Sequence, residues 1–133
     1  MEKNKNFNVA HKLSLAAQRF SHKKALVFPK RRGRHLFYES ITFSELEEKV
    51  NRLACALSNL TIGKDDLILV MIPMSIELYL VFSALLKIGA VAVFIDPWAG
   101  RKQIENCCEL TQPKAFIGTA KAHLLRLLSP SIR

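Results

Sequence analysis

The sequence predicts an α/β protein in which βαβ units form a parallel sheet and an N-terminal β-hairpin precedes them. Apolar runs without polar alternation occur at Leu67–Ile72 and Val91–Ile95, and such runs are typical of strands covered on both faces. Helical patterns of about 10 to 15 residues separate the predicted strands, which favours right-handed crossovers. Half of the 133 residues are hydrophobic, enough for a real core, and no linker or repeat divides the chain.

The first predicted element is a short helix over Asn8–Gln18. It places Val9, Leu13 and either Ala16 or Ala17 on one side. These residues lie three or four positions apart, the spacing that brings side chains onto one face of a helix.

A β-hairpin is predicted next, from the short runs Ala25–Phe28 and Leu36–Ile41. The sequence PKRRGRH separates the two runs, and its Pro29 and Gly33 favour a turn. We expect the hairpin to lie at an edge of the structure.

The segment Ile41–Leu46 has the features of a helix N-terminus. Thr42 can cap the helix and Glu45 can complete a capping box, while Ile41 can contact Leu46 as a hydrophobic staple. The helix is predicted to continue to about Leu60. Its apolar face comprises Leu46, Val50, Leu53, Leu57 and Leu60. The polar residues expected to face elsewhere are Glu47, Glu48, Asn51, Arg52 and Ser58.

The apolar strand Leu67–Ile72 follows a polar turn and is expected to end at Pro73. A helix is predicted over Ser75–Ile88. Lys87 suits the negative end of the helix dipole, and Gly89 can adopt the left-handed conformation of a C-cap. Because this helix is apolar almost all round, we expect it to be buried.

The rest of the chain continues the alternation of strands and helices. The predicted elements are a buried strand at Val91–Ile95, a helix at Arg101–Thr111, a strand at Lys114–Gly118 and a helix at about Ala120–Leu128. The residues of the first helix expected to point inward are Ile104, Cys107, Cys108 and Thr111.

Several classes of protein are disfavoured. Three cysteines, two of them adjacent, indicate neither a disulfide framework nor a zinc site, and we expect Cys55, Cys107 and Cys108 to be small apolar residues in a reducing cytosol. The N-terminus lacks the apolar core of a signal peptide, so a cytoplasmic location is expected. Charged residues, Pro73 and Gly89 interrupt the apolar stretch from residue 67 to residue 95, which favours short buried elements over a membrane span.

Asp96 is the best single candidate for a site residue. It follows the predicted strand Val91–Ile95 and precedes Pro97, and open α/β sheets bind ligands beyond the carboxyl ends of their strands. The alternative, which we favour, is a structural turn in which the Asp96 carboxylate accepts backbone N–H groups.

Basic residues cluster at His22–Lys24 and Lys30–Arg34, and the chain has a net charge of +9. Such clusters can bind phosphate backbones, but no helix-turn-helix or RRM pattern accompanies them. A solvated hairpin tip is therefore favoured, and no specific nucleic acid is expected. The histidines lack metal-site spacing, and the glycines form no phosphate loop. No residue is assigned a catalytic, cofactor-binding or metal-binding role.

Two blocks resemble those of the AMP-forming acyl ligases, the adenylate-forming superfamily of acyl-CoA synthetases, luciferases and peptide-synthetase adenylation domains. The first is Ile41–Leu46, similar to the family's [LI]-T-[FY]-x-E-L motif. The second, Leu86–Pro97, is similar to its L-K-x-G-A-x-x-x-x-[ILV]-[DN]-P block. The version with Trp98 looks closest to fatty acyl-CoA synthetases and olefin β-lactone synthetases.

This resemblance implies an ATP- and magnesium-dependent ligase that joins a carboxylic acid, in this branch a fatty acid, to AMP and passes it to a thiol such as CoA. The blocks present supply no catalytic residue, so residues 1–133 are interpreted as a single partial domain from the start of the large domain, inactive alone and without a cofactor of its own. The alternative is a stand-alone α/β binding module. Exposed sheet surface is expected to favour self-association.

Overall fold

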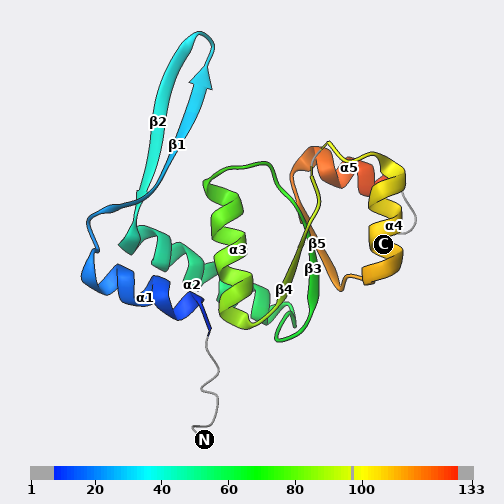
Figure 1. Cartoon of the computed structure of the whole chain (residues 1–133), viewed down its shortest axis with the longest axis horizontal. Helices are drawn as coiled ribbons and strands as arrows, with labels where there is room; N and C mark the ends of the chain where they lie inside the picture. Colours follow the sequence, from blue (N-terminus) through cyan, green and yellow to red (C-terminus); the bar gives the residue numbers. More distant parts are fainter. Residues whose placement is uncertain (1–7, 97, 129–133) are drawn as a thin grey trace, which may run out of the picture.

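A computed structural model of the chain, which describes residues 8–96 and 98–128, contains ten helices and strands within those residues (Figure 1). In chain order they are α1 (Ala10–Arg19), β1 (Lys24–Arg32), β2 (His35–Thr42), α2 (Phe43–Asn59), β3 (Leu67–Met71), α3 (Ile76–Ile88), β4 (Val91–Phe94), α4 (Arg101–Thr111), β5 (Ala115–Gly118) and α5 (Ala120–Leu128). Strands β4, β3 and β5 form a parallel sheet in that order, and β1 pairs antiparallel with β2. The predicted α/β class is confirmed.

The β1–β2 hairpin is longer than predicted and projects from the body as a separate sheet (Figure 1). Only two residues, Gly33 and Arg34, lie between the strands. Gly33 has a φ of +62°, which a tight hairpin turn requires. The sequence PKRRGRH therefore continues both strands, with Pro29 opposite Tyr38 and Arg31 opposite Leu36.

The predicted start of α2 is confirmed. Thr42 Oγ1 accepts a hydrogen bond from the N–H of Glu45 at 3.3 Å, and the Glu45 carboxylate accepts one from the N–H of Thr42 at 2.9 Å. These bonds lower the pKa of Glu45, the backbone bond contributing most. Ile41 and Leu46 are both buried in one cluster, as a hydrophobic staple requires.

The apolar faces of α1 and α2 differ from prediction at their ends. Leu60 is 69% exposed because it is the C-cap of α2, beyond the packed turns, while Ala54 is buried instead. Val9 is exposed because it is the N-cap of α1, and Ala10 is the buried residue of that helix.

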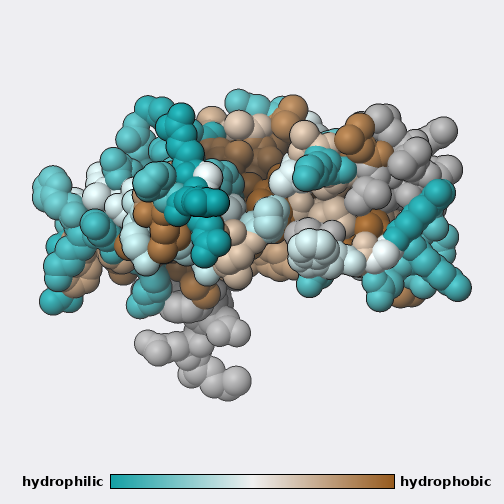
Figure 2. All heavy atoms as spheres, turned by 90° about the horizontal axis from the view of Figure 1, so that it is seen from above, coloured by the Kyte–Doolittle hydropathy of each residue, from teal (hydrophilic) through white to brown (hydrophobic). Residues whose placement is uncertain are grey.

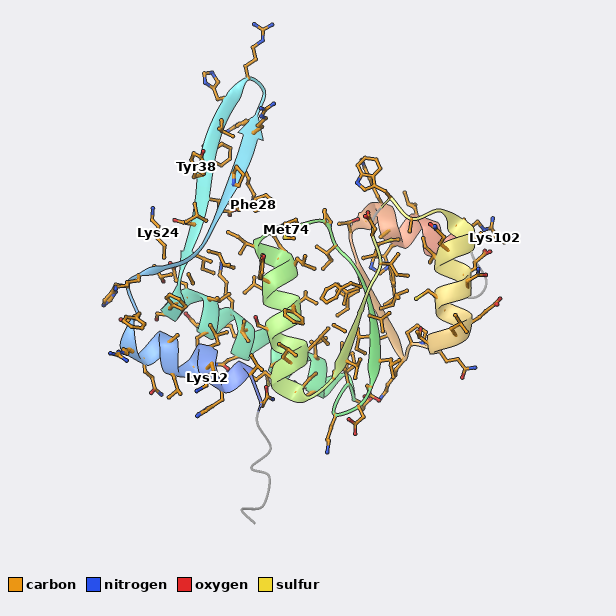
Figure 3. The ribbon with its side chains drawn as sticks, in the orientation of Figure 1. Lys12, Lys24, Phe28, Tyr38, Met74 and Lys102 are labelled. Carbon is orange, nitrogen blue, oxygen red and sulfur yellow. The ribbon has the colours of Figure 1, made fainter. Side chains whose placement is uncertain are left out.

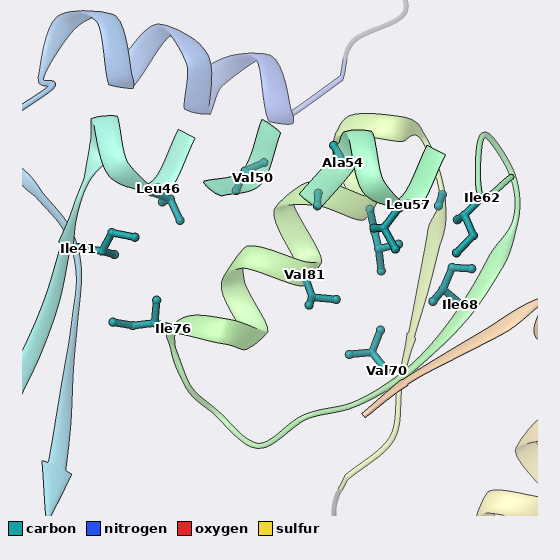
Figure 4. Close-up of a cluster of buried hydrophobic side chains, with 13 residues drawn as sticks. Ile41, Leu46, Val50, Ala54, Leu57, Ile62, Ile68, Val70, Ile76 and Val81 are labelled. Atoms are coloured by element: carbon teal, nitrogen blue, oxygen red, sulfur yellow. The ribbon is translucent and has the colours of Figure 1, made fainter. Parts of the chain in front are cut away.

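The core lies on both faces of β3, as its continuous apolar sequence predicts. Ile68 and Val70 point into a large cluster with α2 and α3 (Figure 4), whereas Leu69 and Met71 contact α4 and α5 on the opposite face. Successive strand residues point to opposite faces, so alternate residues of β3 belong to different clusters. All four of these residues are buried.

Two predictions of burial were wrong. β4 is an edge strand of the described sheet, and its terminal residues Val91 and Phe94 are exposed because no described strand pairs with its outer side. α3 buries Val81, Ala84 and Leu85, but Tyr79 is exposed on its other side. The helix otherwise ends as predicted, with Gly89 at a φ of +76°. No described helix is both long and apolar enough to cross a membrane.

Candidate functional site

The carboxyl ends of the three parallel strands lie at one edge of the sheet, at the top of the body in Figure 1. α3 and α5 begin at this edge. Ser75 Oγ accepts the N–H of Leu78, and Thr119 Oγ1 accepts the N–H of Ala122, each at 3.3 Å. Each helix N-terminus is therefore capped by the chain itself, which leaves fewer free N–H donors for an anion.

An apolar groove of about 560 Å³ occupies this carboxyl edge. Its lining residues come from the ends of β3 and β4 and from the first turns of α3: Ile72, Pro73, Met74, Leu78, Tyr79, Phe82, Phe94, Ile95, Asp96 and Trp98. The Phe82 and Phe94 rings meet edge to face, with centroids 5.5 Å apart. Figure 2 looks down on this edge and shows hydrophobic surface near the middle of the molecule. The groove suits an apolar or aromatic group.

Asp96 borders the groove and adopts the structural role favoured from the sequence. Its Oδ1 accepts the N–H of Trp98 at 2.9 Å, and its backbone carbonyl accepts the N–H of Ala99 at 2.8 Å. The carboxylate thus fixes the turn that follows β4. Pro97, the other half of the predicted pair, lies outside the described residues.

Trp98 is the site residue that sequence reasoning missed. Its side chain is 93% exposed, and it borders both the groove and a second hollow of about 520 Å³ beside Thr119 and Ala122. Periodicity identifies residues that are buried, so it gives no signal for an exposed ring. A tryptophan directly after a strand-ending turn was the available signal.

The opposite, amino edge of the sheet is closed by polar contacts. Lys114, just before β5, donates to the Asp66 carboxylate at 2.7 Å and to the Thr61 carbonyl at 2.6 Å. Asp66 also accepts the N–H of Gly63 at 2.8 Å. The hydrogen bond from Lys114, followed by that from Gly63, lowers the pKa of Asp66. These groups stabilise the turn between α2 and β3.

A second charged cluster joins the three N-terminal helices. Glu47 of α2 accepts hydrogen bonds from Lys87 of α3 at 2.6 Å and from Ser14 of α1 at 2.7 Å. Burial alone would raise the pKa of Glu47, but the bonds from Lys87 and Ser14 hold it below its usual value. Glu47 was predicted to face away from the core. It is partly buried because Lys87 neutralises it there.

The described residues do not assemble a metal or nucleophile site. No group of three or more His, Cys, Asp and Glu side chains within residues 8–96 and 98–128 is arranged to hold a metal ion. Cys108 is buried, which raises the pKa of its thiol and disfavours the reactive thiolate. Cys55, expected from the sequence to be a small apolar residue, is exposed on α2.

Comparison with known proteins identifies the family. The AMP-binding enzyme family matches residues 13–131. The olefin β-lactone synthetase of Stenotrophomonas maltophilia is 32% identical over 94% of this chain and 23% of its own length. An uncharacterized acyl-CoA ligase of Bacillus subtilis is also 32% identical, over 83% of this chain and 20% of its own length.

Solved structures agree with this assignment. The N-terminal subdomain of NpsA from Klebsiella oxytoca, bound to 3-hydroxyanthranilyl-AMSN, superposes with a TM-score of 0.73 at 31% identity over 84% of this chain and 26% of that chain. A fatty acyl CoA synthetase of Mycobacterium tuberculosis shares the fold, with a TM-score of 0.76 at 21% identity over 91% of this chain and 23% of that chain. This chain spans about a quarter of the length of these relatives. The chain belongs to the AMP-binding enzyme family, whose members are adenylate-forming ligases, and has the fold of their N-terminal subdomains.

Proposed function

We propose that this chain is the opening part of the large domain of an AMP-forming acyl-CoA synthetase-like ligase that works in the cytoplasm. The complete ligase would activate a carboxylic acid, in our proposal a fatty acid, with ATP, and pass the acyl adenylate to a thiol such as CoA. The observation that supports this best is the family match over residues 13–131. The choice of a fatty acid rests on the resemblance of the block Leu86–Pro97, followed by Trp98, to that of the fatty acyl-CoA synthetases.

The described residues do not fit ATP by themselves, and no group of three or more His, Cys, Asp and Glu side chains among them is arranged to hold a metal ion. The carboxyl-edge groove is lined mainly by apolar and aromatic side chains. The one carboxylate that lines the groove, that of Asp96, would repel a triphosphate. Asp96 Oδ1 already accepts a hydrogen bond within the turn. The role we propose for the chain is structural: it forms one side of the large domain of the ligase. Its groove would contact another part of the protein or an apolar substrate.

ATP–pyrophosphate exchange tests the proposal that the isolated chain is inactive. We expect no acid-dependent exchange, because no described group is placed to grip a triphosphate. Exchange by the pure chain that is abolished by Asp96→Asn would overturn this role.

A chimera tests the family role directly. The chain would replace the matched quarter of the Stenotrophomonas relative, and we expect a folded protein that retains acid-dependent exchange. A chimera that folds but does not bind ATP would contradict the proposal. The genomic sequence after the codon for Arg133 offers an independent test, since a phosphate-loop motif in any downstream frame is expected.

A further inference from the structure

The β1–β2 hairpin has one face that no described element covers. Residues opposite each other in the register share a face, and this outer face comprises Val27, Pro29, Arg31, Leu36, Tyr38 and Ser40. Val27, Leu36 and Tyr38 are 52%, 53% and 66% exposed. Phe28, on the other face, packs against the core cluster. Figure 3 shows Phe28 on the side of the hairpin nearer α3 and Tyr38 on the opposite side.

The same hairpin is strongly basic. It contains five Lys and Arg residues and one acidic residue, Glu39. Glu39 forms an ion pair with Lys30. The remaining cations are all exposed and have no acidic partner within the hairpin: Lys24, Arg31, Arg32 and Arg34. Three of them gather at the tip, beside the exposed rings of Phe37 and Tyr38.

We propose that the outer face and tip of the hairpin dock on an anionic lipid surface. Cations next to such a surface are attracted to its headgroups, and the attraction extends over about one Debye length. Leu36 and Tyr38 can then leave water by entering the headgroup region, where tyrosine is favoured because its ring is apolar and its hydroxyl polar. The hairpin projects from the body, so its tip reaches the surface without the helices (Figure 1).

Charge and side-chain chemistry favour this occupant over two others. A second copy of the chain would bring two basic hairpins together, and like charges repel. The phosphates of a nucleic acid would pair with the arginines, but they would not bury the aliphatic side chains of Val27 and Leu36. The lipid surface uses both the charges and the apolar side chains.

Vesicle co-sedimentation of the full chain at physiological salt tests the proposal. We expect binding to vesicles of phosphatidylcholine mixed with phosphatidylglycerol and little binding to phosphatidylcholine alone. Arg31→Glu combined with Arg32→Glu should weaken binding about tenfold or more, because two attractions become repulsions. Leu36→Ser combined with Tyr38→Ser should weaken it about tenfold while leaving the net charge unchanged.

The matched control reverses two charges elsewhere. Lys102 of α4, which lies far from the hairpin in Figure 3, and Lys121 of α5 are both exposed. Lys102→Glu combined with Lys121→Glu should leave vesicle binding within about twofold. Far-UV circular dichroism checks that each variant is folded. Equal loss in this control, equal binding to neutral vesicles, or stronger binding to single-stranded RNA at the same phosphate concentration would overturn the proposal.

Discussion

The two edges of the parallel sheet differ in how completely the described chain satisfies them. At the amino edge, Lys114 links Asp66 to the Thr61 carbonyl, so the polar groups find partners within the chain. At the carboxyl edge, exposed aromatic side chains such as Phe94 and Trp98 surround an apolar groove. The difference indicates that the amino edge is closed by contacts within the chain, whereas the carboxyl edge is a surface suited to further contacts.

The two edges are expected to differ most in how much the free energy of unfolding falls when a side chain is truncated. Leu85, in the last turn of α3 near the amino edge, is fully buried, whereas Met74 at the carboxyl edge is exposed. Leu85→Ala should lower the free energy of unfolding by about 3 kcal/mol, because it leaves a cavity. Met74→Ala should lower it by less than about 0.5 kcal/mol. Urea denaturation measures both, and similar losses would remove the distinction between the edges.

The Glu47–Lys87 pair should make stability depend on pH. The pKa of Glu47 is lowered from 4.5 in the folded chain, so its stabilisation is fully present above 4.5 and is lost as the pH falls through the folded value. Glu47→Gln should cost about 1 kcal/mol at neutral pH and flatten the acid side of the stability profile. Glu48→Gln, at an exposed position on the same helix, is the control. Identical profiles for the two variants would contradict this role.

The junction at Gly89 should be sensitive to a side chain. Its φ of +76° is strained for other residues, so Gly89→Ala should cost about 1 kcal/mol in thermal or urea unfolding. Gly63→Ala is the matched comparison, because Gly63 has no positive φ and a methyl group there meets nothing within 4 Å. A neutral Gly89→Ala variant would argue against the left-handed cap.

The smallest effect on stability is expected at Trp98, the most exposed of the large apolar side chains that the structure describes. Trp98→Ser should leave the free energy of unfolding unchanged within about 0.5 kcal/mol. It should nevertheless reduce association of the chain, measured by dynamic light scattering, because it removes apolar surface from the open edge. Unchanged association would show that this edge is not the contact surface.

Local signals in the sequence predicted the helix ends and the inward faces of the helices well. The cap at Thr42 and Glu45, the turn at Gly89 and the inward residues Ile104 and Cys108 all obey short-range rules and lie as predicted. The same rules failed where neighbours along the chain do not decide the outcome. The exposure of β4 depends on strand order, and the partial burial of Glu47 depends on Lys87, forty residues away.

The candidate site was less predictable than the fold. Asp96 was found because a residue after a strand occupies a known position in α/β sheets, and its turn role followed from its short carboxylate. The groove was not predicted, since it requires Tyr79 and Phe82 of α3 to meet Phe94 of β4. The nearly uniform apolar character of α3 predicted that the whole helix is buried, so it gave no sign of an open side.

Light scattering on the isolated chain over a range of concentrations is the most direct test of the claim that the carboxyl edge is open for further contacts. At physiological salt, which screens the net charge of +9, we predict a mass that rises with concentration above the 15.1 kDa of one chain. Supplying the rest of a family ligase by co-expression should reduce this association. A constant mass of 15.1 kDa with cooperative thermal unfolding would contradict the claim and identify the chain as a self-sufficient domain.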